Sequence, residues 1–213
     1  TEINEKFLSP RRTEISESEE IIDDESLITS EEVVVTFTNT GYIKRVPLNS
    51  YRAQRRGGKG RAGMTTKEED YVNKVFVVNT LTPLLFFSSL GIVYKLKTYK
   101  IPTGSPTSKG KALVNILPLR SGEKITATMP YDQSDDQNNI IFATSTGNIR
   151  RNRLTDFHNI NANGKIAMKL KEGDELVNVI ICSEKDNIFM STKLGKCIRL
   201  SLIHISEPTR QDR

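Results

Sequence analysis

The sequence has no tryptophan, only two cysteines and two histidines, and no long run of apolar residues. Two cysteines are too few for a disulfide framework, so Cys182 and Cys197 are expected to be ordinary core or edge residues in a reducing cytoplasm. His158 and His204 have no Cys, Asp or Glu at ligand spacing, so no metal site is expected. No apolar stretch approaches the ~18 residues that suggest a membrane span, and no membrane partner is expected.

The sequence also lacks the motifs of the common catalytic sites. It contains no phosphate-binding loop that ends in GK[ST], no paired His and Cys, and no HExxH. The carboxylate clusters at 68–70 and 135–136 lie in polar segments that are expected to be exposed loops. We therefore predict that this chain contains no catalytic residue and holds no cofactor.

Charge is distributed very unevenly along the 213 residues. Residues 1–32 contain eleven acidic and three basic side chains, whereas the remaining residues carry a net charge of +13. A basic body of this kind is typical of proteins that contact nucleic acid. In the acidic stretch at residues 14–32, carboxylates alternate with Ser and Thr and aromatic residues are absent. This pattern favours a solvated linker over the alternative, a competitor for the basic surface.

The most basic stretch is the heptapeptide QRRGGKG at residues 54–60, which combines three cations with three glycines. Glycine lets the backbone approach a surface closely, and Arg and Lys side chains donate to phosphate oxygens. The window 33–67 around it holds eight Lys or Arg residues and no acid. A polyanion is therefore the predicted partner, and the candidate contacts are Gln54, Arg55, Arg56, Gly57, Gly58, Lys59 and Gly60.

Glycine-centred turns between short apolar stretches recur along the chain. Their spacings are 50, 56 and 48 residues, and the turn glycines are Gly41, Gly91, Gly147 and Gly195. A second small-residue loop follows in three repeats, 19, 19 and 17 residues farther on, at Gly60, Gly110 and Gly164. Repeats of ~40 to 50 residues with about four short strands each are the signature of propeller-like folds.

The predicted fold is therefore all-β, a propeller-like array of four-stranded blades, and a β-sandwich is the competing architecture. A lead-in over residues 1–32 precedes the repeats, which are expected at about 33–82, 83–138, 139–187 and 188–200. The repeat pattern is lost after Leu200, so residues 201–213 are expected to be a foreign tail without function. An array with three full repeats and the start of a fourth should leave a strand edge unpaired.

Basic residues recur near the end of the second strand of each hairpin. A single such pair would indicate a solvated strand end, but recurrence in four repeats predicts a positive rim that follows a nucleic-acid backbone without reading its sequence. The residues expected to bind DNA on this rim and on the second glycine loops are Lys44, Arg45, Lys95, Lys97, Lys109, Lys111, Arg150, Arg151, Arg153, Lys165 and Arg199.

The heptapeptide and the repeats together resemble the C-terminal domain of the bacterial DNA gyrase A subunit, in which QRRGGKG is the defining gyrase A box. Residues 11–15 are similar to the end of that family's N-terminal breakage-reunion region, and the segments 68–70, 115–119 and 173–176 are similar to parts of its repeats. The resemblance covers about residues 5–200. It implies a β-pinwheel of six four-stranded blades, of which about three and a half are present in a piece of a longer polypeptide.

The resemblance also implies a function, which is to bind and wrap duplex DNA without sequence specificity. In the family, the wrap supports ATP-dependent negative supercoiling by an A2B2 heterotetramer of gyrase A and gyrase B proteins, in the cytoplasm and associated with the nucleoid. ATP and Mg²⁺ bind elsewhere in that assembly. The DNA-cleaving tyrosine belongs to the N-terminal region, so this chain alone should be inactive.

Two alternative functions remain open. The first is the related domain of topoisomerase IV, which lacks an intact box. The second is a propeller scaffold that binds an acidic protein. Cations that recur on every repeat favour a long, uniform polyanion over one compact protein partner.

Overall fold

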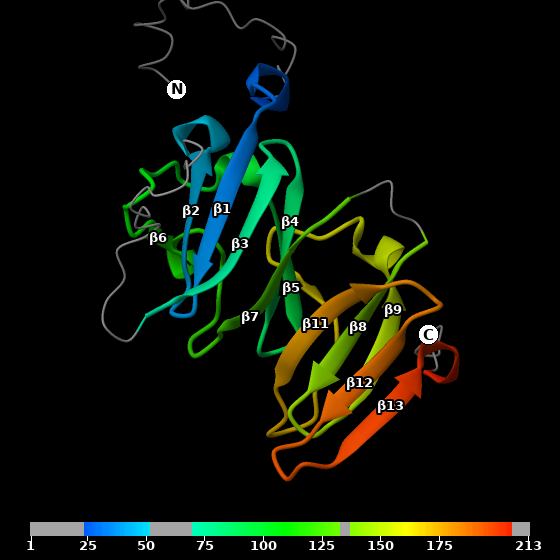
Figure 1. Cartoon of the computed structure of the whole chain (residues 1–213). Helices are drawn as coiled ribbons and strands as arrows, with labels where there is room; N and C mark the ends of the chain where they lie inside the picture. Colours follow the sequence, from blue (N-terminus) through cyan, green and yellow to red (C-terminus); the bar gives the residue numbers. More distant parts are fainter. Residues whose placement is uncertain (1–23, 52–69, 133–136, 206–213) are drawn as a thin grey trace, which may run out of the picture.

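The computed structural model describes residues 24–51, 70–132 and 137–205. In these residues the regular structure consists of short antiparallel strands and single turns of 3-10 helix. The strands form successive sheets, or blades, which lie side by side in Figure 1. The all-β architecture of repeated blades that the glycine spacing predicts is confirmed.

The first two blades have four strands each. Blade 1 has the order β3-β1-β2-β6, and its strands are β1 (Glu32–Thr38), β2 (Tyr42–Pro47), β3 (Val72–Asn79) and β6 (Lys111–Ala112). Blade 2 has the order β10-β5-β4-β7, and its strands are β4 (Pro83–Ser88), β5 (Ile92–Lys97), β7 (Ile125–Pro130) and β10 (Lys165–Ile166).

The last two blades have fewer strands in the described residues. Blade 3 has the order β11-β8-β9, with β8 (Asn139–Thr144), β9 (Ile149–Arg153) and β11 (Leu176–Cys182). Blade 4 is a hairpin of β12 (Asn187–Ser191) and β13 (Cys197–Ser201). Within these described residues β9 pairs only with β8, which agrees with the expectation of an open strand edge.

Each of the first two blades takes its fourth strand from the following repeat. Tyr42 of β2 pairs with Ala112 of β6, and Val93 of β5 pairs with Lys165 of β10. We call the side of a sheet that carries such a strand the exchange edge. The strands β3, β7 and β11 form the opposite edge, where β7 packs against β11. The exchange ties consecutive repeats together through backbone hydrogen bonds.

Glycine is required immediately before each exchanged strand. Gly110 has a φ of +82°, and a Cβ there would lie 2.5 Å from the carbonyl oxygen of Ile43. Gly164 has a φ of +84°, and its Cβ would lie 2.8 Å from the ring of Tyr94. These are the second loop glycines of the sequence repeats, and their role is to let the exchanged strand approach its partner closely.

The hydrophobic core lies between the blades rather than within any one of them. Because side chains alternate along a strand, each central strand contributes to two interfaces. Phe86 faces blade 1, whereas its neighbour Phe87 faces blade 3. There Phe87 meets Phe142 edge-on, with ring centroids 5.7 Å apart. A smaller cluster around Ile141 joins blades 3 and 4.

A 3-10 turn follows the second strand of every repeat. These turns are η2 (Leu48–Ser50), η3 (Thr98–Lys100), η5 (Leu154–Phe157) and η6 (Leu202–His204), while η1 (Asp24–Leu27) precedes β1 and η4 (Leu113–Asn115) follows β6. In the fourth repeat η6 follows β13, and Leu202 is fully buried. The expectation that residues 201–213 are a foreign tail stays a prediction. Residues 206–213 lie outside the described residues.

A buried aspartate closes the hairpin turn of blade 3. Asp174 accepts hydrogen bonds from the Ser145 hydroxyl at 2.7 Å, and from the Thr146 hydroxyl and backbone amide at 2.8 and 3.1 Å. Asp70 accepts from the backbone amide of Thr40 in the matching turn of blade 1. Burial alone would raise the pKa of Asp174, but the hydrogen bonds outweigh it and hold that pKa well below its usual range.

Asp174→Asn is expected to lower the free energy of unfolding at neutral pH and to flatten its dependence on pH. Because the folded-state pKa lies below the unfolded value of ~3.9, the carboxylate stabilises the fold above that value. The contribution is lost as the pH falls through the folded-state pKa. Urea unfolding from about pH 7 to about pH 2, followed by circular dichroism, should give curves for the two proteins that converge in acid. Parallel curves would contradict a role for the charge.

Candidate nucleic-acid interface

The candidate contacts fall into two groups, those outside the described residues and those within them. Gln54, Arg55, Arg56, Gly57, Gly58, Lys59 and Gly60 lie outside the described residues. In the described repeats, the sequence counterparts of Gly60 are Gly110 and Gly164, which directly precede the exchanged strands β6 and β10. Candidate cations of the second and third repeats can therefore be placed relative to the exchange edge.

Lys44 does not lie on an exposed rim, which corrects the expectation from sequence. Its side chain is fully buried, and its amine donates to the backbone carbonyls of Ser105, Pro106 and Ser108. Burial lowers the pKa of Lys44. All three acceptors belong to the second repeat, so Lys44 holds the segment that leads to β6 against β2.

Another recurring cation connects adjacent blades. In three repeats the basic residue four positions after the turn glycine donates to a carbonyl at the 3-10 turn of the next repeat. The pairs are Arg45 Nε to Ile101 at 2.7 Å, Lys95 Nζ to His158 at 2.9 Å and Arg151 Nη1 to Leu202 at 3.3 Å. We call these contacts the blade latches. The blade latches therefore explain why a basic residue recurs at this position of these repeats without reference to a ligand.

Arg199, Arg153 and Arg150 occupy the later repeats. Arg199 is the fourth-repeat counterpart of the latch residues and is exposed, and Arg153 at the end of β9 is exposed as well. Arg150 is half-buried, and its Nε donates to Asn152 at 3.1 Å. Two of these three guanidinium groups therefore lie at the surface of blades 3 and 4.

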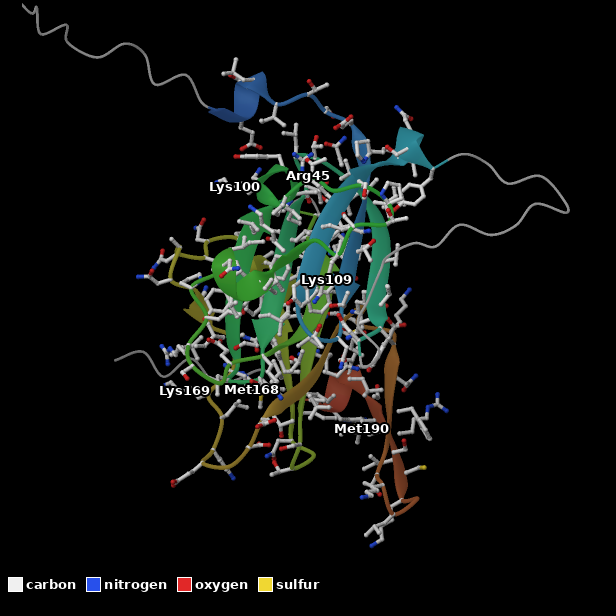
Figure 2. The ribbon with its side chains drawn as sticks, turned by 90° about the vertical axis from the view of Figure 1, so that its left-hand side faces the viewer. Arg45, Lys100, Lys109, Met168, Lys169 and Met190 are labelled. Atoms are coloured by element: carbon white, nitrogen blue, oxygen red, sulfur yellow. The ribbon has the colours of Figure 1, made fainter. Side chains whose placement is uncertain are left out.

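The lysines of the exchanged strands are the most accessible candidates in the first two blades. Lys111 in β6 and Lys165 in β10 occupy equivalent positions and are both exposed. Lys109 lies over the ring of Tyr42, with its amine 3.8 Å from the ring centroid, and Figure 2 labels it on blade 1. Lys165 also donates to the backbone carbonyl of Asp156. The structure thus places equivalent cations on the exchange edges of successive blades.

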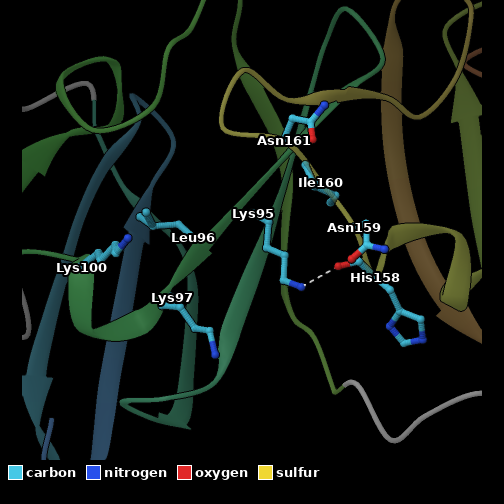
Figure 3. Close-up of a pocket in the computed structure, with 8 residues that line it drawn as sticks. All are labelled: Lys95, Leu96, Lys97, Lys100, His158, Asn159, Ile160 and Asn161. Atoms are coloured by element: carbon cyan, nitrogen blue, oxygen red, sulfur yellow. Dashed lines mark hydrogen bonds between the residues drawn. The ribbon is translucent and has the colours of Figure 1, made fainter. Parts of the chain in front are cut away.

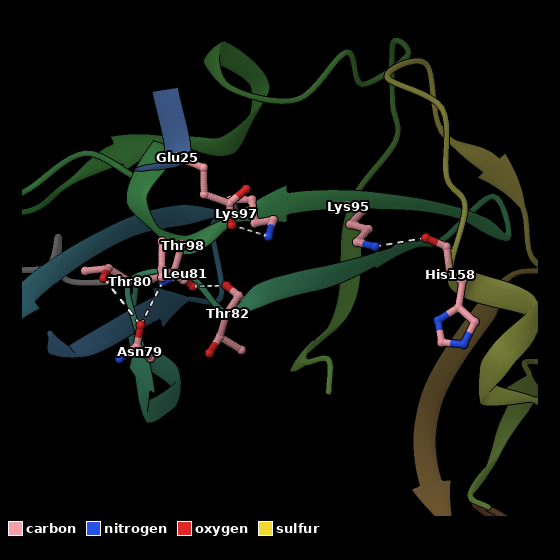
Figure 4. Close-up of polar contacts among 9 residues, drawn as sticks. All are labelled: Glu25, Asn79, Thr80, Leu81, Thr82, Lys95, Lys97, Thr98 and His158. Atoms are coloured by element: carbon pink, nitrogen blue, oxygen red, sulfur yellow. Dashed lines mark hydrogen bonds and ion pairs between the residues drawn. The ribbon is translucent and has the colours of Figure 1, made fainter. Parts of the chain in front are cut away.

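Sequence reasoning missed two charged residues beside Lys97. Lys97 forms an ion pair with Glu25 of η1, with 2.6 Å between Nζ and Oε1 (Figure 4). Lys100, at the end of η3, lines the same surface pocket as Lys95 and Lys97 (Figure 3). The sequence could have indicated Lys100, because it lies three residues after Lys97 and three residues make one turn of a 3-10 helix.

The described residues contain no group of three or more His, Cys, Asp or Glu side chains arranged to hold a metal ion. Within the same residues, no helix is long and apolar enough to cross a lipid bilayer. The buried cysteine Cys182 contributes to the interface of blades 3 and 4, and Cys197 is exposed on β13.

The fold and the charged exchange edges define a class of all-β, propeller-like domains whose blades share strands and carry basic residues on one edge. Within that class, the chain belongs to the family described as "DNA gyrase C-terminal domain, beta-propeller". The family matches residues 32–79, 82–132, 138–183 and 186–213, one stretch for each repeat. The last stretch continues past Leu200, where the sequence pattern was expected to end.

Curated relatives and solved structures agree with this assignment. The chain is 52% identical over 200 residues to the DNA gyrase A subunit of Rickettsia conorii. It is 41% identical over 194 residues to the DNA gyrase A subunit of Escherichia coli. These matches cover 92% and 91% of the chain but only 22% of each relative. The crystal structure of the C-terminal domain of DNA topoisomerase IV superposes on this chain with a TM-score of 0.74 at 24% sequence identity. The superposition covers 85% of this chain and 55% of that one, and it shows that the two share a fold.

Proposed function

We propose that this chain binds and wraps duplex DNA without sequence specificity, as part of DNA gyrase in the bacterial cytoplasm. Its partners in this proposal are duplex DNA, the rest of the gyrase A protein and the gyrase B protein. The wrap supports ATP-dependent negative supercoiling, for which ATP and Mg²⁺ bind elsewhere in the assembly. The observation that carries the proposal is the exposed lysine at an equivalent position in β6 and in β10, in a member of the gyrase C-terminal domain family.

The spacing of these cations suits a continuous backbone of phosphates. Lys111 and Lys165 are exposed at matching registers of blades 1 and 2, because each belongs to a strand exchanged between repeats. The blade latches and the shared cores keep consecutive blades in a constant relation. A ligand that meets Lys111 and follows the array from blade 1 to blade 2 therefore meets Lys165 at the equivalent position. Lysine contacts of this kind position DNA but do not read its bases.

The binding of duplex DNA is expected to weaken steeply as salt increases. Each phosphate that a cation neutralises contributes about −0.9 to the slope of log K against log salt concentration, so about five contacts give a slope near −4.5. Titration of two duplexes of unrelated sequence, at several salt concentrations, measures both the slope and the lack of sequence preference. A slope near zero would contradict wrapping, and a strong preference for one duplex would contradict backbone binding.

A further inference from the structure

A basic pocket lies where blade 2 meets the third repeat. It has a volume of about 490 Å³ and is open to solvent, between β5 with η3 on one side and residues 158–161 on the other (Figure 3). Lys95, Lys97 and Lys100 line the first side, and Asn159 and Asn161 line the second. No acidic residue is among the described residues that line it. The pocket therefore combines three cations with two side-chain amides.

This pocket is not simply repeated from blade to blade. Lys97 and Lys100 lie six and nine residues after the turn glycine of their repeat. The first repeat has Pro47 and Ser50 at those positions, and the third has Arg153 and Asp156. Only the second repeat places two lysines there. The charge of this pocket is thus a property of one particular junction and is separate from the equivalent lysines of β6 and β10.

Two lysines of the pocket, Lys95 and Lys97, are close enough to repel each other. Burial lowers the pKa of Lys95, and the charge of Lys97 lowers it further. Lys95 already donates to the His158 carbonyl at 2.9 Å. An anion bound between Lys97 and Lys100 would offset this repulsion, while the amides of Asn159 and Asn161 can donate to its oxygens.

One carboxylate from outside the pocket already contacts it. Glu25, in the acidic segment before β1, pairs with Lys97 at 2.6 Å (Figure 4). The two side chains are 31% and 30% exposed. Ion pairs with this much exposure are weak, so another anion can displace the carboxylate. The contact brings one residue of the acidic segment, Glu25, to the basic surface.

We propose that this pocket binds one phosphate group of the DNA backbone, and that Glu25 competes with that phosphate for Lys97. The inference rests on the proposed function, because the phosphate belongs to the duplex. A phosphate in the pocket touches β5 and η3 of the second repeat and residues 158–161 of the third. Binding therefore ties blade 2 to the next repeat at the same junction as the Lys95 latch. The acidic segment reduces the affinity of this site for DNA.

The test is duplex binding by the whole chain at several salt concentrations. Lys100→Ala is expected to weaken binding about fivefold and to reduce the magnitude of the salt slope by about 0.9, because one phosphate contact is lost. Glu25→Gln is expected to tighten binding by up to about fivefold. The matched control is Lys124→Ala, which removes an exposed lysine next to β7, on the edge opposite β10. It should change the affinity far less.

A double-mutant cycle separates competition at Lys97 from a general loss of negative charge. The gain from Glu25→Gln should disappear in a Lys97→Ala background, since the carboxylate then has no site to block. An undiminished gain would overturn the competition. If Lys100→Ala behaves like Lys124→Ala, the phosphate site is overturned, while a steep slope in the unaltered chain still supports wrapping. If the unaltered chain shows no salt-dependent binding, both proposals fail.

A titration with inorganic phosphate, at constant ionic strength against chloride, identifies the source of the anion. Backbone amide resonances of residues 97–100 and 158–161, followed by NMR, report binding in the pocket. The expected result is weak binding of free phosphate and DNA binding that depends on Lys100. Free phosphate binding that depends on Lys100, combined with DNA binding that does not, would overturn the assignment to the DNA backbone.

Discussion

Lys44→Ala is expected to lower the free energy of unfolding by about 3 kcal/mol. The substitution removes a fully buried side chain and leaves the carbonyls of Ser105, Pro106 and Ser108 without their common donor. Because these carbonyls belong to the segment that leads into β6, the loss should loosen the exchanged strand as well. Urea denaturation followed by far-UV circular dichroism measures the effect.

Two further variants show which property of Lys44 matters. Lys44→Met keeps most of the aliphatic length but donates no hydrogen bond, so it should retain only part of the lost stability. Lys111→Ala removes an exposed lysine of β6 and should change stability by less than about 0.5 kcal/mol. If Lys44→Ala instead leaves stability intact and weakens DNA binding, Lys44 is a surface contact and its buried placement is contradicted.

Alanine at Arg55, Arg56 and Lys59 together is expected to weaken duplex binding about 100-fold and to reduce the salt slope by about 2.7. The reason is the loss of three cations from one glycine-rich heptapeptide. In a complete gyrase A protein combined with the gyrase B protein, supercoiling should be abolished while relaxation is largely spared. In the proposed function, supercoiling depends on the wrap that this chain forms, whereas relaxation does not. Gel assays of both reactions make the comparison.

The matched control for the box removes the same amount of charge elsewhere. Lys124, Lys171 and Lys193 are exposed and lie in segments between strands, outside the exchanged strands. Replacing all three by alanine should leave the supercoiling reaction nearly unchanged and should reduce the salt slope much less. If the box variant loses relaxation and supercoiling equally, the heptapeptide has a structural role instead.

The repeats were predictable because the chemistry of a tight turn is local. Gly41, Gly91, Gly147 and Gly195 all adopt positive φ values between +73° and +86°, and only glycine does so at little cost. The apolar segments on each side then form antiparallel hairpins, as expected. The loop glycines at 110 and 164 were also found from spacing alone.

The partners of the exchanged strands could not be found in the same way. β6 and β10 are two residues long, and β6 pairs with a strand almost 70 residues earlier in the chain. No local pattern indicates such a distant backbone contact. The same difficulty applies to Lys44 and Arg45. Neighbouring side chains of a strand point to opposite faces, and only the packed structure shows that a segment of the next repeat covers the face of Lys44.

The sequence by itself determined the class of fold, the number of repeats and the family, because each depends on turn glycines, apolar alternation and one distinctive heptapeptide. The tertiary structure decided which cations are exposed and which are engaged within the protein. It assigns Lys44 to the interior, uses Arg45, Lys95 and Arg151 as blade latches, and places Lys111 and Lys165 on the exchange edges. The physical reason is that charge is a property of a residue, whereas the availability of that charge depends on which distant backbone carbonyls reach it.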